Sequence, residues 1–309
     1  MPHLAITFQS WLLVTALGII WGGSFIATEI ALHDLSPYWI TAYRMSIAAG
    51  LVSLVWARRG LPLYHASSGP MLPLFALGVL NAALPFQLIT WGQQHVTAGF
   101  AGVSMASVGI FVLPMAHFLI KGEQLNAGRL FGFLIGLGGV AILIGDSALD
   151  TSGSDLEWLG RLSCIAGASC YAISSIITRQ LPVIDPVGLL AVPLIVGALY
   201  CVGVALMLAG PPKLMSEDAF LAVVMLGLFP TALAGLLRDQ VIRTAGPVFM
   251  SLANYQVPIW SVIFGILFLG EPFFLNLLLA LTLVLLGTGL SQKDALRSLF
   301  QNAKQNPRT

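Results

Sequence analysis

Five ionisable side chains within or beside apolar stretches are the residues of this sequence that most invite chemistry. They are Glu29, Arg44, His117, Arg238 and Asp239. A charge in an apolar stretch is costly and usually faces a partner or a water-filled path. Helical spacing puts the first two near one end of their stretches and the last three near the opposite end, as expected for ion-pair or gate groups. Static ion pairs, or Arg side chains that extend toward a polar boundary, are the alternative.

Uncharged polar and aromatic side chains recur at helical spacing in the same stretches. Steps of three and four place Trp21, Ser24 and Thr28 on one stripe. Amides in an apolar medium need several hydrogen bonds, and aromatic rings can contact a cation. Serine and threonine hydroxyls have a simpler role, because they often bond to the carbonyl of the preceding turn. The candidate lining of a polar cavity is Trp21, Ser24, Thr28, Asn81, Gln87, Ser104, Ser107, Tyr171, Ser175, Asn254 and Pro258.

Motifs of enzymes are missing from the sequence. It contains no His-Glu-x-x-His, no Gly-x-Ser-x-Gly and no phosphate loop. The string Gly136-x-Gly138-x-x-Ala141 fits a dinucleotide fingerprint, but no strand precedes it. The five histidines have no metal-ligand spacing. We therefore predict no enzyme, no cofactor and no metal site.

The elements that position these side chains are long apolar segments. Of 309 residues, 57% are hydrophobic and 9% charged, against about 25% charged in soluble domains. A membrane-spanning helix needs roughly 20 apolar residues. We predict an all-α polytopic membrane protein with ten transmembrane helices, at residues 11–30, 38–57, 71–92, 98–120, 127–145, 159–178, 187–209, 219–237, 247–269 and 273–291.

The positions of Lys and Arg predict the orientation in the membrane. With the N-terminus inside, most of these residues fall on the cytoplasmic side, as short positively charged loops do. We expect a multi-pass protein of the cell (inner) membrane with both termini cytoplasmic and the first helix retained. A net charge of +1 argues against a nucleic-acid partner. Cys164, Cys170 and Cys201 fall inside spans, where thiols behave as small apolar groups.

The two halves of the chain share local strings at matching positions. Thr-Ala-Gly precedes the fourth and ninth spans, at residues 97–99 and 244–246, and Gly-Glu follows each, ending at Glu123 and Glu271. Pro85 and Pro230 interrupt the third and eighth spans. Five helices per copy would make the second copy enter from the opposite face, so we predict an inverted repeat, which is typical of transporters. We expect the two glutamates to cap the next helix.

These strings resemble the EamA group of the drug/metabolite transporter superfamily. The resemblance rests on Trp21-Gly22-Gly23-Ser24-Phe25, on Arg44 early in the second span, and on the run from Pro258 to Glu271. The sequence departs from the family pattern at Tyr171-Ala172 and at Pro114. The resemblance implies a first repeat at 1–146, a second at 147–292 and a cytoplasmic tail at 293–309. It also implies a central cavity lined by helices 1, 3, 4, 6, 8 and 9.

Family membership implies the movement of small metabolites through that cavity, and the chain looks most like amino-acid and metabolite exporters. A lining of hydroxyls, amides and aromatic rings favours a zwitterionic or neutral substrate. A drug, sugar derivative or nucleobase exporter, or a channel, is the alternative. Proton coupling and facilitated diffusion both remain open. Gly128, Gly132 and Gly136 form a ridge for close helix packing, within one chain as a monomer in lipid or, alternatively, in a dimer.

Overall fold

The computed structural model describes residues 7–64, 69–119, 127–145, 155–245, 247–291 and 293. Within these ranges the chain is helical, and its β-pairing is a single isolated bridge between Tyr64 and Ile184. Eight helices in the described part are long and apolar enough to cross a membrane, and two further apolar helices, Ala127–Ile142 and Leu275–Leu290, are shorter. The polytopic all-helical class is therefore confirmed, whereas the count of ten spans remains a prediction.

The first half of the chain supplies the elements up to residue 145. They are α1 (Phe8–Leu32), α2 (Pro37–Arg58), α3 (Leu72–Leu77), η1 (Gly78–Ala83), α4 (Leu84–Gly92), α5 (Ala98–Ser104), η2 (Met105–Ser107), α6 (Val108–Leu119) and α7 (Ala127–Gly145).

The second half supplies the rest. Its elements are α8 (Glu157–Gln180), α9 (Pro186–Ala209), α10 (Glu217–Leu226), η4 (Gly227–Leu233), α11 (Ala234–Ala245), α12 (Pro247–Leu269) and α13 (Leu275–Ser291). Glu123 and the tail from residue 294 lie outside the described residues.

Three of the predicted spans are interrupted rather than continuous. The third contains the π-helical turn η1 before Pro85, the eighth contains the π-helical turn η4 around Pro230, and the fourth contains the 3₁₀ turn η2. Proline has no N–H and its ring crowds the carbonyl four residues earlier. At Pro230 that carbonyl belongs to Leu226, and the Thr231 hydroxyl donates to it at 2.8 Å. The wide turns thus occur at corresponding spans of the two halves.

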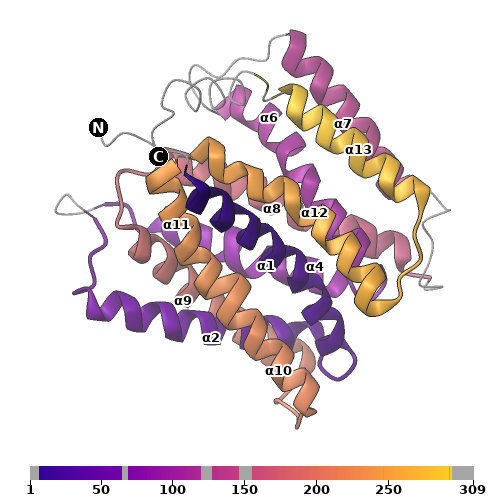
Figure 1. Cartoon of the computed structure of the whole chain (residues 1–309). Coiled ribbons are helices and arrows are strands. Elements are labelled where there is room, and N and C mark those ends of the chain that lie inside the picture. Colours follow the sequence, from indigo (N-terminus) through magenta and orange to yellow (C-terminus); the bar gives the residue numbers. More distant parts are fainter. Residues whose placement is uncertain are drawn as a thin grey trace.

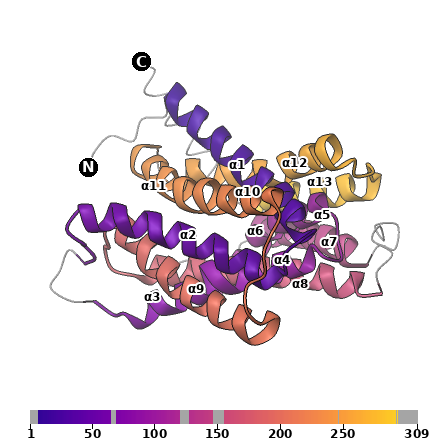
Figure 2. The same cartoon turned by 90° about the horizontal axis from the view of Figure 1, so that it is seen from below.

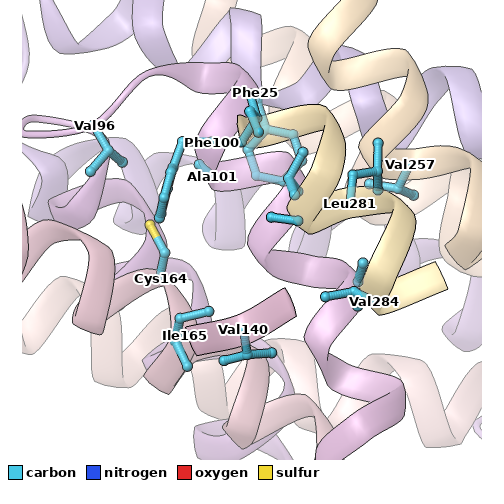
Figure 3. Packing of buried hydrophobic residues seen from close by; sticks show 14 of the residues in the cluster. Phe25, Val96, Phe100, Ala101, Val140, Cys164, Ile165, Val257, Leu281 and Val284 are labelled. Atoms are coloured by element: carbon cyan, nitrogen blue, oxygen red, sulfur yellow. The ribbon is translucent and has the colours of Figure 1, made fainter. Parts of the chain in front are cut away.

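The most extensive packing joins one half of the chain to the other. α1 packs on α12, α2 on α9, α4 on α8, α5 on α12 and α7 on α13, and Figures 1 and 2 show α7 beside α13 and α2 beside α9. The largest buried cluster draws Phe25, Phe100, Cys164, Val257 and Leu281 from five different helices (Figure 3). The two halves therefore share a core.

The glycine ridge of α7 is used inside the chain. A Cβ added at Gly287 of α13 would lie 2.4 Å from the Gly136 nitrogen and 2.5 Å from the Gly132 oxygen. These are backbone atoms of α7, so α7 and α13 can approach this closely only with glycine at residue 287. The close packing predicted for Gly132 and Gly136 is present within one chain. Gly128 lies one turn earlier on α7, and a dimer through this ridge stays the alternative prediction.

Candidate functional site

Arg44 is the centre of a polar and aromatic cluster inside the bundle. It lies seven residues into α2, about 10 Å along the helix axis, and is 5% exposed. Its Nε donates to the Thr231 hydroxyl at 2.8 Å, and its Cζ lies 3.8 Å from the centroid of the Phe86 ring. The contact with Phe86 is within the range of a cation–π interaction. Arg44 of the first half is thus held by η4 of the second.

Aromatic side chains from three helices contact this guanidinium, its ring partner Phe86 or the turn η4 that holds it. Phe86 of α4 meets Tyr171 of α8 edge-on, with ring centroids 6.1 Å apart. Tyr171 is close enough to Arg44 for the phenol and the guanidinium to interact electrostatically. The Trp21 Nε1 donates to the Pro230 carbonyl at 3.0 Å, one residue before Thr231. The predicted cavity residue Tyr171 therefore contacts the ring that packs on Arg44, and Trp21 bonds to the same turn, η4, that holds Arg44.

The two predicted amides of the third span behave differently. Asn81, on the π-helical turn η1, is exposed and its Oδ1 accepts from the Ser174 hydroxyl at 2.9 Å. Gln87 on α4 is 7% exposed, and its Nε2 is buried without a hydrogen-bond partner. Asn81 joins α8 to the broken third span, whereas Gln87 carries an unused donor.

The predicted serine and threonine residues donate to their own helices. The Ser24, Thr28, Ser104, Ser107 and Ser175 hydroxyls bond to carbonyls three or four residues earlier. Ser104 and Ser107 are fully buried, whereas Ser175 is exposed. The simpler role is thus the one these hydroxyls have in this structure, because each uses its proton within its own span.

The predicted residues of the ninth span lie on α12. Asn254 is exposed. Pro258 is buried, and its carbonyl accepts from the buried Ser261 hydroxyl at 2.9 Å. α12 packs closely against α1 and α5 at this level, since a Cβ at Gly102 of α5 would meet the Ser261 hydroxyl.

Glu29 does not pair with Arg44. One carboxyl oxygen of Glu29 is buried without a hydrogen-bond partner, and its carboxyl group interacts electrostatically with Glu271. The predicted pair is wrong because Arg44 turns toward η4 and α4, whereas Glu29 lies where α1 approaches α5 and α12.

Glu271 caps a helix, but not the next one. Its carboxylate accepts from the Ala98 N–H at 2.6 Å and from the Gly99 N–H at 2.9 Å, at the start of α5. Burial raises the pKa of Glu271, and the two N–H bonds oppose that rise. The cavity beside it has a volume of 20 Å³, about that of one water and far below a metabolite site. Glu271 therefore ties the ninth span to the fourth.

The three groups predicted near the opposite end are described only in part. His117, in the last turn of α6, places its ring 4.9 Å from that of Phe118. Arg238 on α11 is exposed. The side chain of Asp239 lies outside the described residues, so a gate at this end remains a prediction.

A comparison with known protein families shows to which family the chain belongs. The model of the EamA-like transporter family matches residues 9–145 and again residues 158–291. The chain belongs to this family. The sequence resemblance is confirmed, and the protein is a multi-pass membrane transporter of the drug/metabolite transporter superfamily.

Relatives of this EamA-like transporter are also described as transporters. The chain is 25% identical over 281 residues to an uncharacterized transporter, YoaV, of Bacillus subtilis, covering 89% of this chain and 93% of that protein. It is 29% identical over 258 residues to an uncharacterized inner membrane transporter, YedA, of Escherichia coli, covering 81% and 79%. A solved crystal structure at 19% identity superposes with a TM-score of 0.63 over 94% of this chain and 98% of its own, which shows the same fold.

Sequence reasoning missed two residues of the Arg44 cluster in this EamA-like transporter. Phe86 and Thr231 each stand beside a residue that the sequence did single out, Gln87 and Pro230. A phenylalanine in an apolar helix carries no signal of its own. Thr231 has one, because a hydroxyl just after a helix-breaking proline can bond the carbonyl that the proline leaves free.

Proposed function

We propose that this protein is a carrier that moves small zwitterionic or neutral metabolites, amino acids first among them, across the cell (inner) membrane. The carrier works by alternating access between two inverted five-helix repeats, residues 1–146 and 147–292, with both termini and the tail at 293–309 in the cytoplasm. Drugs, sugar derivatives or nucleobases carried by the same fold are the alternative.

The observation that carries the proposal is the way polar side chains join the two halves at their broken helices. Trp21 bonds to Pro230, Arg44 to Thr231 and Asn81 to Ser174, each pair spanning the halves. Helices broken at mid-span expose backbone groups and are where many carriers bind substrate. A polar cluster shared by two bodies can exchange its contacts when one body rocks against the other.

The chemistry of the cluster supports a small polar substrate. Aromatic rings, one cation and amides surround the broken helices, and a zwitterion carries both a group for the cation and a group for the ring faces. A neutral drug would use the rings but leave the cation unmatched. Amino acids therefore come before drugs in the proposal.

Counterflow in proteoliposomes tests the proposed transport of amino acids. Liposomes loaded with an amino-acid panel that includes the aromatic residues, Met and Thr should accumulate labelled external substrate, and the exchange should saturate. Protein-free liposomes are the control. If no amino acid exchanges while a nucleobase or sugar derivative does, the substrate class is wrong and the carrier mechanism stands. Flux that fails to saturate would favour a channel instead.

A further inference from the structure

The guanidinium of Arg44 uses few of its hydrogen-bond donors. A guanidinium has five N–H groups, and in this structure its Nε bonds to Thr231. In the part of the chain that the structure describes, the two terminal nitrogens have no hydrogen-bond partner and no carboxylate lies within ion-pair distance of Arg44. Ion pairs elsewhere occupy Arg59 and Arg161, with Asp185 and Glu157. Arg44 is therefore a buried cation without an anion.

Leaving such a cation unmatched is energetically unfavourable. Charged groups that are nine-tenths buried are ordinarily paired, and Arg44 is 5% exposed. Contact with the face of the Phe86 ring offsets part of the cost of burying the charge. The ring cannot accept hydrogen bonds from the N–H groups that point outward in the plane of the guanidinium. These in-plane N–H groups are suited to donate hydrogen bonds to the oxygens of an anion.

The Tyr171 hydroxyl is a second unused hydrogen-bond donor of the cluster. Tyr171 meets edge-on the same Phe86 ring that the guanidinium contacts, and its hydroxyl has no hydrogen-bond partner in the described residues. The oxygen of Thr231 is already used, since it accepts from Arg44 and donates to Leu226. The cluster therefore complements a ligand that accepts hydrogen bonds.

We propose that Arg44, assisted by the Tyr171 hydroxyl, binds the carboxylate of the transported substrate. This inference rests on the proposed transport function and names the chemical group that the cluster recognises. One planar guanidinium edge matches one carboxylate through two parallel N–H···O bonds. A phosphate dianion would bring a second negative charge for which the cluster has no second cation. The substrate class is thus monocarboxylates, which includes amino acids.

Binding to the purified full-length protein in detergent tests the assignment with matched probes. Benzoate and benzamide have the same shape and differ in charge, and inorganic phosphate supplies a different oxyanion. The readout is the shift in melting temperature at rising probe concentration. For the unmodified protein we expect benzoate to bind more tightly than either benzamide or phosphate.

Variants of Arg44 then identify the group that provides the discrimination. R44Q should weaken benzoate binding roughly 10- to 100-fold, as loss of a charge-assisted bond does, and should leave benzamide binding unchanged. R44K keeps the charge without the planar fork and should lie between R44Q and the unmodified protein. R58Q removes an exposed cation from the last turn of the same helix and should change neither probe.

Y171F keeps the proposal falsifiable if R44Q does not fold. It removes one hydroxyl, keeps the ring against Phe86, and should weaken benzoate binding about 3- to 10-fold with benzamide unaffected. Equal binding of benzoate and benzamide, tighter Arg44-dependent binding of phosphate, or benzoate binding unaltered in R44Q and Y171F would each overturn the assignment.

Counterflow separates this result from the proposed function. If amino acids exchange but R44Q and Y171F transport an amino acid and its amide as the unmodified protein does, the carboxylate site is wrong and the transport function stands. If no amino acid exchanges but benzoate binds through Arg44, the substrate is another monocarboxylate and the amino-acid proposal fails alone.

Discussion

Hydroxyl groups and larger polar groups have separate tasks in this transporter. The hydroxyls of Ser24, Thr28 and Ser104 donate hydrogen bonds within their own helices. These hydroxyls are therefore not left as buried donors without a partner. Arg44 and Gln87 keep unused donors, and Glu29 keeps an unused acceptor. Among the described residues, those with unused polar atoms are therefore few.

Thr231 both satisfies the broken helix at Pro230 and holds Arg44, the residue proposed to bind the substrate. Its hydroxyl donates a hydrogen bond to the Leu226 carbonyl, which Pro230 leaves free, and accepts one from the Arg44 Nε. T231V keeps the shape and loses both bonds, so we expect a stability loss of about 1–3 kcal/mol, the cost of unmade buried hydrogen bonds. We also expect at least a tenfold loss of counterflow, because Arg44 is no longer positioned.

The matched control is T282V on α13. The Thr282 hydroxyl makes the same kind of bond to Leu278 at 2.7 Å, but the residue is exposed and far from the cluster in sequence. Melting temperature and counterflow should stay near those of the unmodified protein. Equal effects of the two substitutions would show that a generic helix hydroxyl, and not the Arg44 contact, matters.

At the scale of elements, close contacts between helices set the geometry of the bundle. G287A adds a methyl group that would lie within 2.5 Å of α7 backbone atoms, so α7 and α13 must separate or tilt. Overpacking of this kind costs about 1–3 kcal/mol, and we expect a lower melting temperature in detergent.

G289A on the same helix provides the comparison. A Cβ at Gly289 meets nothing within 4 Å, and alanine favours a helix over glycine by roughly 1 kcal/mol. The melting temperature of G289A should be unchanged or higher. A G287A protein as stable as G289A would refute the close α7–α13 packing.

The cap at the start of α5 is a second contact between elements. E271Q can accept through one oxygen only, so one of the Ala98 and Gly99 N–H bonds is lost together with the carboxylate charge at the helix N-terminus. We expect a loss of about 1–2 kcal/mol in stability, measured by thermal unfolding in detergent. D155N, at an exposed aspartate, should have no effect, and an E271Q protein of normal stability would show that the cap is dispensable.

At the scale of the whole molecule, the two halves are interlocked rather than placed side by side. The packing partners correspond between the halves: α1 packs on α10, η4 and α11 of the eighth span, and α8 packs on α3, η1 and α4 of the third. This pattern supports the proposed repeat, because an internal two-fold relation requires matching pairs. Movement of one half against the other must then change the polar contacts at Trp21, Arg44 and Asn81.

Orientation in the membrane is a prediction for the whole chain. Alkaline phosphatase is active only outside the cytoplasm, whereas green fluorescent protein fluoresces when it folds in the cytoplasm. A phosphatase fusion after Gly210, in the connection that carries Lys213, should be active. Fusions at the C-terminus should be fluorescent and lack phosphatase activity. The reverse pattern would invert the topology, because the positive residues would then lie outside.

Composition and periodicity were enough to predict the helical membrane class and most span positions, because bilayer insertion selects long apolar segments whatever their partners. The family was predicted from the resemblance of short motifs such as Trp21-Gly22-Gly23-Ser24-Phe25. Trp21, Tyr171 and Arg44 were also recognisable, since polar and aromatic groups in such segments are costly to place. Their partners were not. Pairing Arg44 with Thr231 instead of Glu29, and Glu271 with α5 instead of α13, depends on helices that are distant in sequence and close in space. Those contacts follow from packing and from the wide turns at Pro85 and Pro230, which only the tertiary structure decides.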